Sequence, residues 1–136
     1  MPNKIRLAGS QLAEFQAELD TLRSQVMADV GETDAVYIRR VRIAAQTSAI
    51  AGRSLLMFGV GPISWVAGIA TLAQAKILEN MELGHNVLHG QYDFMNDPSF
   101  NSKTYSWDMV CAPENWRKTH NVEHHNYTNI LGLDND

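Results

Sequence analysis

The feature that most constrains the fold of this chain is a long run of residues without charge. Between Arg53 and Lys76 lie 22 consecutive uncharged residues, SLLMFGVGPISWVAGIATLAQA. As a helix with a rise of 1.5 Å per residue, this run would extend over roughly 33 Å, which is about the hydrocarbon thickness of a bilayer. The run begins too far from Met1 to belong to a signal peptide. It therefore predicts an all-α, helical membrane protein.

Two arrangements in the membrane are consistent with this run. In the first, one helix over residues 54–75 crosses the bilayer once. In the second, helices over 41–60 and 62–78 form a tight hairpin that turns at Gly59-Val60-Gly61-Pro62, because glycine suits the turn and proline suits the first turn of a helix. The hairpin places Arg53 within a span, which costs about 3 kcal/mol on insertion scales. A buried hairpin of a soluble protein is the third alternative, because polar residues dilute the apolar signal.

An amphipathic helix is predicted ahead of this region, within residues 1–32. Its apolar residues recur at alternating spacings of three and four, which places them on one face of a helix: Leu12, Phe15, Leu19, Leu22 and Val26. Gly31 ends the helix, and Thr33 is suited to cap a second helix that starts near Asp34. The stripe favours a helix packed on its own protein over one in the membrane interface or in a dimer.

Composition narrows the classes of function. The length of 136 residues suits one domain, and a formal net charge of -4 argues against a nucleic-acid binder with a strongly basic surface. Cys111 is the single cysteine and has no partner for an internal disulfide. Three arginines stand just before the apolar region and would hold that end of it in the cytoplasm: Arg39, Arg40 and Arg42.

All five histidines lie in two short groups in the C-terminal half. The first group is His85-Asn-Val-Leu-His89 and the second is His120-Asn-Val-Glu-His124-His125. Residues four apart share one face of a helix, so each spaced pair can converge on one metal ion. His125 is turned by about 100° from His124, so that this adjacent pair can address two ions. Neutral imidazole suits zinc, copper, iron and nickel alike. We predict that all five are metal ligands.

Two carboxylates precede the first histidine group. Glu82 lies near the His85 face of a helix and is placed to accept a hydrogen bond from its free ring nitrogen, although Glu79 and Glu82 are explained equally well as surface charges. A helix that continues from the uncharged run would carry His85 roughly 15 Å beyond it. Metal chemistry is therefore expected at the membrane surface.

The residues around the two histidine groups predict a loop and a helix. After Gly90 the sequence is rich in Asn, Asp, Ser, Pro and aromatic residues, which predicts an ordered loop with turns near Asn96-Asp97-Pro98. A helix is expected from Pro113 or Glu114 to about Tyr127. The second histidine group lies on this helix.

With these motifs in place, the chain resembles the membrane-bound fatty acid desaturases, particularly the bacterial acyl-lipid or acyl-CoA type. The segments ENMELGHNVLHGQYDFMNDP and WRKTHNVEHHNYTNILG look like the first and second histidine boxes of that family. The resemblance extends over about residues 39–131. It includes the sequence segments that flank the histidines as well as the spacing of the histidines.

The resemblance implies a non-haem di-iron enzyme that uses O2 and two electrons to remove two hydrogens from a saturated acyl chain. Its cytosolic iron ligands would be His85 and His89 from the first box and His120, His124 and His125 from the second. The implied partners are a fatty acyl substrate carried as acyl-CoA or acyl-lipid, an electron donor such as a ferredoxin or cytochrome b5, and the lipid bilayer. The implied location is a bacterial inner membrane with both boxes facing the cytoplasm.

The family pattern also has a third box, of the form HxxHH, and further membrane helices. Here the sequence ends at Asp136, eleven residues past His125. We therefore expect a single partial desaturase domain over 1–136, with a membrane region over 41–78 and a histidine-box region over 79–136. Such a truncated piece is expected to be inactive alone. An even number of crossings keeps the arginines and both boxes on one side, which favours the hairpin.

Two other functions stay open. A lipid or alkane hydroxylase or ketolase of the same histidine-box superfamily would carry the same two boxes. A non-catalytic, membrane-anchored metal-binding module would instead hold zinc stably at five histidines in the isolated chain. A partial desaturase domain is expected to bind metal only weakly. Metal analysis of the purified chain therefore distinguishes it from a metal-binding module.

Overall fold

The computed structural model describes residues 8–107 and 111–134, whose regular structure is helical apart from an isolated bridge between Leu131 and Asp134. The chain divides into two compact units, Met1–Thr33 and Asp34–Asp136. The described residues are thus all-α, as the sequence indicated.

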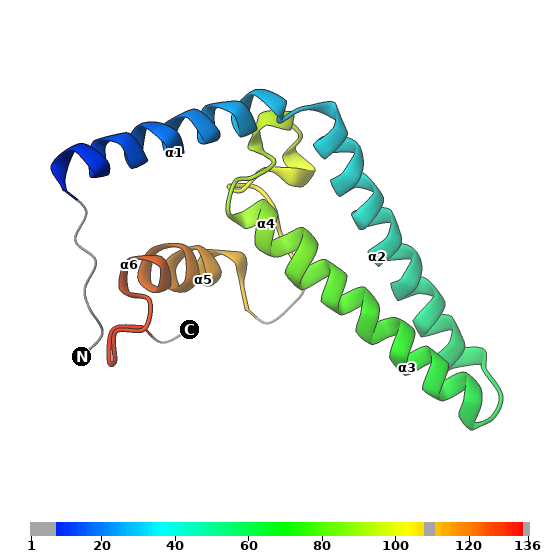
Figure 1. Cartoon of the computed structure of the whole chain (residues 1–136). Coiled ribbons are helices and arrows are strands. Elements are labelled where there is room, and N and C mark those ends of the chain that lie inside the picture. The colour runs from blue at the N-terminus through cyan, green and yellow to red at the C-terminus, as the bar shows by residue number, and fades with distance from the viewer. Residues whose placement is uncertain (1–7, 108–110, 135–136) are drawn as a thin grey trace. The chain divides into compact units, whose positions relative to one another are not determined.

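The first unit contains helix α1, Gly9–Asp29, near the blue end of the chain in Figure 1. The side chain of Gln11 accepts a hydrogen bond from the backbone N–H of Ala8 at 2.9 Å and so caps the start of the helix. Val30 adopts an extended conformation and ends it. The predicted N-terminal helix is present, and no residue of α1 is buried. Its apolar stripe is about half exposed: Leu12, Phe15, Leu19, Leu22 and Val26.

The second unit begins with a helical hairpin. Helix α2 spans Glu32–Phe58 and helix α3 spans Pro62–Ile77, with the turn between them at residues 59–61 (Figure 1). Gly61 has a φ of 86°, in the left-handed region that glycine adopts at little cost, and Pro62 stands in the first turn of α3. The predicted position of the turn is confirmed, whereas α2 begins at Glu32, two residues before the predicted start.

The two helices of the hairpin approach closely where both carry glycine. A Cβ added at Gly52 of α2 would lie 2.8 Å from the backbone nitrogen of Leu72 and 3.0 Å from the carbonyl oxygen of Gly68, both in α3. Ala45 and Ala75 are also buried. Small side chains therefore allow the backbones to pack at a distance that larger residues would prevent.

The predicted membrane spans are wrong. No helix within the described residues is both long enough and apolar enough to cross a membrane. The turn at residues 59–61 divides the uncharged run, so no single helix forms over 54–75 and α3 has 16 residues. Helix α2 has 27 residues, but charged side chains interrupt its apolar character: Arg39, Arg40, Arg42 and Arg53.

The histidine region consists of two helical segments and the loop that joins them. Helix α3 continues without a break through a π-helical segment, η1 (Leu78–Gly84), into α4 (His85–Leu88). The loop contains two short 3-10 turns, η2 (Asp93–Met95) and η3 (Pro98–Phe100). The second helical segment comprises α5 (Pro113–Lys118), the π-helical η4 (Thr119–His124) and α6 (His125–Tyr127). The expected loop turns and the expected helix over 113–127 are both confirmed.

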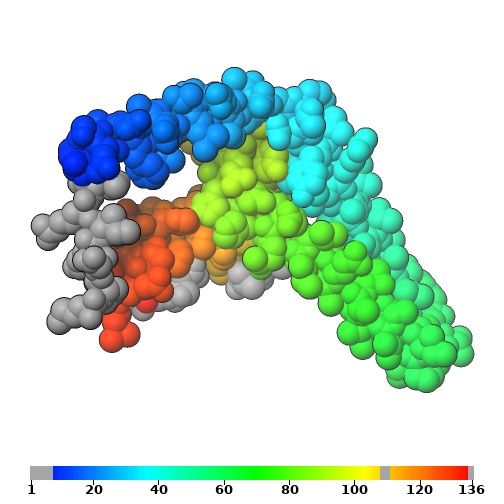
Figure 2. Space-filling model, viewed as in Figure 1, coloured from blue at the N-terminus to red at the C-terminus, as the bar shows by residue number. Residues whose placement is uncertain are grey.

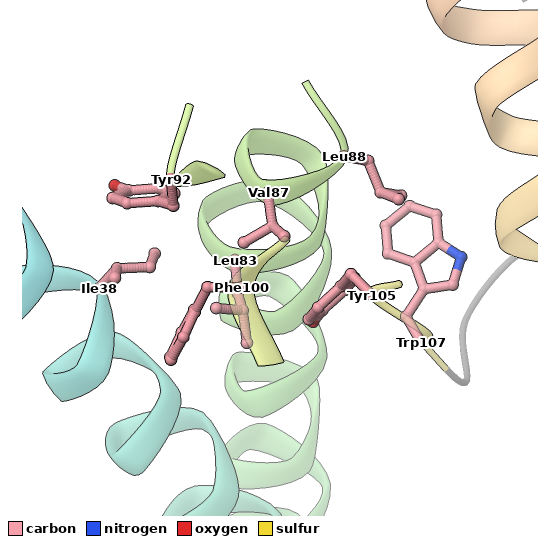
Figure 3. Close-up of a cluster of buried hydrophobic side chains, with 8 residues drawn as sticks. All are labelled: Ile38, Leu83, Val87, Leu88, Tyr92, Phe100, Tyr105 and Trp107. Carbon is pink, nitrogen blue, oxygen red and sulfur yellow. The ribbon is translucent and has the colours of Figure 1, made fainter. Parts of the chain in front are cut away.

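One apolar cluster joins α2, the segment of η1 and α4, and the loop (Figure 3). Ile38 of α2 and Val87 of α4 have no exposed surface. Full burial of such side chains stabilises a fold by about 1.5–3 kcal/mol each. The other members of the cluster are Leu83, Leu88, Tyr92, Phe100, Tyr105 and Trp107. This cluster fixes the orientation of the helix that carries the first histidine group.

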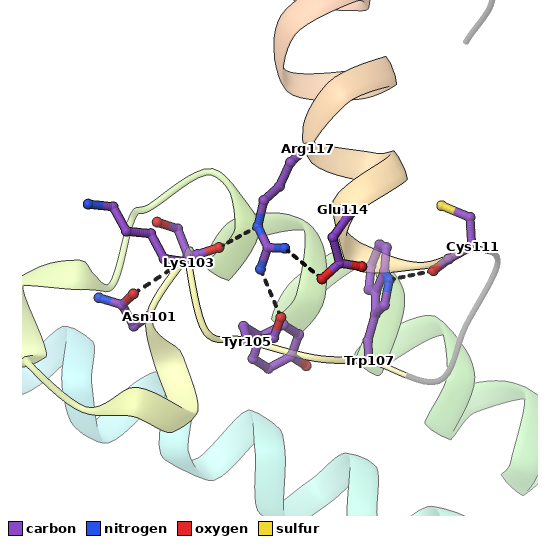
Figure 4. Close-up of polar contacts among 8 residues, drawn as sticks. Asn101, Lys103, Tyr105, Trp107, Cys111, Glu114 and Arg117 are labelled. Atoms are coloured by element: carbon purple, nitrogen blue, oxygen red, sulfur yellow. Dashed lines mark hydrogen bonds and ion pairs between the residues drawn. The ribbon is translucent and has the colours of Figure 1, made fainter.

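Arg117 of α5 ties the loop to the second helical segment (Figure 4). Its Nε donates to the carbonyl oxygen of Ser102 at 2.7 Å and its Nη2 to that of Tyr105 at 3.0 Å, while its Nη1 lies 3.6 Å from the carboxylate of Glu114. The carboxylate of Asp93 accepts from both the backbone nitrogen and the hydroxyl of Ser102, at 2.7 Å each. The loop is thus held in a defined conformation between the two histidine groups.

Candidate metal centre

The fold brings the two histidine groups together. His85 begins α4 and His89 follows its last residue, whereas His120 and His124 belong to η4 and His125 begins α6. Ring centroids lie 4.6 Å apart for His85 and His89, 5.0 Å for His85 and His120, and 4.8 Å for His89 and His125. His124 joins the group through a stacked contact with His120 at 5.1 Å. All five predicted ligands therefore form one cluster of rings.

Three of these histidines converge closely enough to share an ion. Candidate ligand atoms of His85, His89 and His120 all lie within 4.8 Å of one another, and the Nε2 atoms of His85 and His89 are 3.1 Å apart. Imidazole nitrogens bind zinc at about 2.1 Å, so two that share such an ion at angles of 90–110° are separated by about 3.0–3.4 Å. The separation of the His85 and His89 atoms fits that geometry, whereas the 4.8 Å that bounds the three-residue group is wider. Metal ligation itself stays a prediction.

Both histidine groups are associated with π-helical turns. Segment η1 ends directly before His85, and η4 contains His120 and His124. A π turn adds one residue to the helical repeat, and such turns occur frequently at functional sites. The four-residue spacing predicted ordinary α-helical geometry, and no residue type in the sequence indicates a π turn. These two irregularities are a feature of the site that the sequence did not reveal.

Two tryptophans support the cluster from one side. The ring of Trp116 stacks on His120, with centroids 4.2 Å apart, and meets His85 edge-on at 5.7 Å. Trp107 packs edge-on against Trp116 at 5.0 Å, and its Nε1 donates to the carbonyl oxygen of Cys111 at 2.9 Å (Figure 4). Both tryptophans therefore act as packing residues beside the histidines.

A side-chain hydrogen bond connects the two helical segments directly. The Nδ2 of Asn121 donates to the carbonyl oxygen of Leu88 at 2.8 Å. Because Asn121 follows His120 and Leu88 precedes His89, this bond joins the two helical segments directly beside the histidine cluster. The separation of 33 residues between donor and acceptor explains why sequence patterns do not predict it.

The electrostatic environment keeps His89 neutral. Burial, together with the neighbouring imidazoles of His85, His120 and His125, lowers the pKa of His89 to about 4. The neutral form is the one that binds metal ions. In the metal-free chain, the unfolded state binds a proton near pH 6.5 that the folded state does not. This histidine therefore lowers stability progressively as the pH falls from about 6.5 towards 4.

The carboxylates near the first group have partners of their own. Glu79 forms an ion pair with Lys76 at 3.1 Å, and Glu82 accepts a hydrogen bond from the hydroxyl of Tyr37 at 3.3 Å. The negative charge of Glu82 raises the pKa of Tyr37 and so keeps its phenol protonated. A carboxylate that sequence analysis did not select, Asp134, lies 2.9 Å from the Nδ1 of His124.

Comparison with known proteins places the chain beside the fatty acyl desaturases. It is 48% identical over 130 residues to the NADPH-dependent stearoyl-CoA 9-desaturase of Mycobacterium tuberculosis, in each of two strains. The match covers 96% of this chain and 30% of the relative, so the chain spans about three tenths of the length of the curated relatives it matches. No protein-family model and no solved structure matches it. The resemblance to desaturases is confirmed at the level of sequence similarity.

Proposed function

We propose that this chain supplies part of the di-iron centre of an O2-dependent fatty acyl-CoA desaturase. The observation that carries the proposal is the cluster of five imidazoles, contributed by two separate helical segments. The 48% identity to a stearoyl-CoA 9-desaturase supports the substrate class, a saturated acyl chain on coenzyme A. The name of that relative also supports NADPH as the source of electrons.

The residues of the site fit iron. The donor set that the fold brings together within the described residues is made of imidazoles, which suit Fe²⁺. Iron would supply the oxidising power that removal of hydrogen from an unactivated C–H bond requires. In the balanced reaction, O2, two electrons and two protons accept two hydrogens from the acyl chain, giving one carbon–carbon double bond and two molecules of water.

The protein's own contribution is to hold and shield the ligands. His85 and His89 are aligned by α4, whose opposite face is fixed in the apolar cluster through Val87. Trp116 covers the ring of His120, which is 8% exposed, and so keeps water from one side of the cluster.

The activity is tested in a chimaera with the full length of the relative. In the M. tuberculosis relative, the aligned segment is replaced by this chain, and stearoyl-CoA, NADPH, a reductase and O2 are supplied. We expect a 9-monounsaturated product from the chimaera and loss of that product when His89→Ala removes a predicted ligand. The 136-residue chain alone is expected to give no product and to retain less than one equivalent of iron after desalting.

Two results would overturn the proposed function. One is a chimaera that folds and binds iron yet releases a hydroxylated acyl chain in place of the alkene. The other is an isolated chain that keeps one equivalent of zinc through desalting and whose chimaera is inactive, as a metal-binding module predicts. Glu123→Ala is the control for His89→Ala and should leave product formation unchanged. The Glu123 side chain lies in the second histidine group but pairs with Lys118 at 3.9 Å.

We further propose that the chain works at a lipid surface, on the cytoplasmic side of a bacterial inner membrane. The support is the end of the α2–α3 hairpin, whose side chains lie at the surface (Figure 2). The exposed fractions reach 95% for Val60 and 85% for Ile63, and the same end carries further exposed apolar residues: Met57, Phe58, Val66 and Ile69. An exposed apolar patch of this kind is typical of a membrane or protein interaction site.

Vesicle flotation tests this location. We expect the chain to float with vesicles of phosphatidylglycerol and phosphatidylethanolamine, and Phe58→Asp combined with Val60→Asp to lower its partition coefficient roughly 100-fold. That factor corresponds to loss of about 3 kcal/mol from two apolar side chains that no longer enter the lipid. Leu131→Asp is the matched control, because Leu131 is equally exposed and lies outside the hairpin. A wild-type chain that stays in the aqueous fraction would contradict the proposal.

A further inference from the structure

A carboxylate outside both histidine groups is bonded to one of the histidines. The Oδ1 of Asp134 lies 2.9 Å from the Nδ1 of His124, and the Asp134 side chain is only 10% exposed. Neither residue type nor spacing links the pair, because Asp134 comes ten residues after His124 and beyond the end of the helix. The contact therefore depends on how the segment after α6 folds back.

A compact turn brings Asp134 to this position. Asn129 has a φ of 63° and Gly132 a φ of 85°, both in the left-handed region that reverses the chain direction. The carbonyl oxygen of Ile130 accepts from the backbone nitrogens of Leu133 and Asp134, each at 3.0 Å. The turn thus returns the chain to the helix it has just left.

The carboxylate of Asp134 is held at both of its oxygens. While Oδ1 faces His124, Oδ2 accepts a hydrogen bond from the backbone nitrogen of Asn129 at 2.8 Å. A carboxylate fixed by a backbone donor cannot rotate away from the imidazole without losing that bond. The Asp134 carboxylate is therefore fixed in its orientation towards His124, unlike a carboxylate that is surrounded by solvent.

The direction of the hydrogen bond determines the state of the His124 ring. An ionised carboxylate has no proton to give, so the Nδ1 of His124 must be the donor. In a neutral imidazole the other nitrogen, Nε2, then carries the lone pair that binds a metal ion. Metal-binding histidines commonly donate their second ring nitrogen to a carboxylate, which fixes the tautomer and the ring orientation.

We propose that Asp134 is a positioning residue that fixes His124 as an Nε2 metal ligand. This inference rests on the proposed function, because it assumes that the histidine cluster binds a metal ion. It adds a residue that lies outside both histidine groups. The turn over 128–134 then has a defined role, because it places the Asp134 carboxylate beside the second histidine group.

The test compares two substitutions at Asp134 in the full chain. Asp134→Ala removes the acceptor, and Asp134→Asn keeps an oxygen acceptor of the same shape without the charge. In the metal-free wild type, long-range ¹H–¹⁵N NMR should show His124 protonated at Nδ1. The Asp134→Ala variant should shift it towards the Nε2-protonated tautomer, while Asp134→Asn retains the Nδ1 proton.

Metal binding is measured with Co²⁺ alone, which reports coordination through its visible absorption. We expect the Co²⁺ affinity to fall 10–100-fold for Asp134→Ala and less for Asp134→Asn, in line with the loss of other carboxylates that orient metal ligands. Asp97→Ala is the matched control, because Asp97 also caps a turn, accepting from the backbone nitrogen of Ser99 at 2.9 Å, in the loop that joins the histidine groups. It should change neither the tautomer nor the affinity.

The outcomes separate this inference from the function on which it rests. If the wild type binds Co²⁺ and Asp134→Ala leaves the His124 tautomer or the affinity unchanged, the positioning role is overturned and the proposed function stands. If the wild type binds no Co²⁺ at all, the positioning role is overturned, whereas the proposed function expects only weak metal binding by the isolated chain and is decided by the chimaera. Equal losses of Co²⁺ affinity in Asp134→Ala and Asp97→Ala would also overturn the positioning role, because general destabilisation then accounts for the loss.

Discussion

Replacement of Gly84 by alanine is expected to destabilise the histidine region by about 2 kcal/mol, the usual scale for forcing an extra methyl group into a packed core. A Cβ at this position would lie under 3.0 Å from the six-membered ring of Trp107 and 3.0 Å from the carbonyl oxygen of Glu79. Trp107 is 7% exposed and its Nε1 is bonded to the carbonyl oxygen of Cys111, so the ring has little freedom to move. The strain would pass to Trp116, which packs on Trp107.

The sign of this effect makes it diagnostic. Within a helix, alanine is intrinsically more favourable than glycine by about 1 kcal/mol, so helix propensity alone predicts that Gly84→Ala stabilises the protein. Urea unfolding followed by circular dichroism measures the difference. Gly9→Ala is the control, because a Cβ there has no atom within 4 Å. A Gly84→Ala variant as stable as the wild type would show that Trp107 does not pack against this helix as described.

Local features of the fold were predictable because their causes lie within a few residues. Gly61 and Pro62 set the hairpin turn through backbone preferences that act at the turn itself. Pro113 likewise marks the start of the helix that carries the second histidine group. The histidine cluster was predictable for a different reason: ligand chemistry requires several imidazoles, and their grouping is visible in the sequence.

The membrane spans were mispredicted because, within the described residues, neither helix of the hairpin combines the length and the apolar character that a span requires. The same glycine and proline that predict the hairpin turn also shorten the apolar helix to 16 residues. In α2, the charge of Arg53 falls between the weakly apolar residues and the apolar end of the helix. The uncharged run is long in the sequence, but the turn divides it between α2 and α3.

The supporting residues of the site could not be predicted, because they act across long sequence separations. Trp116 reaches His85 and Asn121 reaches the carbonyl oxygen of Leu88, each from more than 30 residues away. Asp134 depends on a turn whose end point is set by several backbone hydrogen bonds together. No periodicity or motif encodes such contacts, and they become visible only when the two helical segments are placed side by side.

Removal of the Trp116 side chain is expected to have an even larger effect on the cluster than the strain at Gly84. The ring stacks on His120 at 4.2 Å and contacts both His85 and Trp107, so Trp116→Ala leaves a cavity beside three aromatic rings. Truncation of a packed tryptophan costs about 3–5 kcal/mol, and the lower end applies here because Trp116 is only partly buried. The fold around the second histidine group should therefore loosen.

Phenylalanine at the same position separates stacking from hydrogen bonding. The indole Nε1 of Trp116 is buried without a hydrogen-bond partner among the described residues, so Trp116→Phe removes a polar group that contributes no bond. We expect this variant to lose less than about 1.5 kcal/mol, the usual limit when an apolar side chain is replaced by a similar one. Trp65→Ala is the control for loss of a tryptophan in general, because Trp65 is 56% exposed in α3.

Urea unfolding gives the free energies for these variants, and the ¹H NMR shift of the His120 ring reports the stack itself. The upfield shift that a stacked aromatic ring induces should disappear in Trp116→Ala and persist in Trp116→Phe. If Trp116→Phe is as damaging as Trp116→Ala, the indole N–H must have a partner outside the described residues. If neither variant changes the shift, the stack is not what holds His120 in place. The pair of substitutions thus decides whether the Trp116 ring orients this ligand or only fills space beside it.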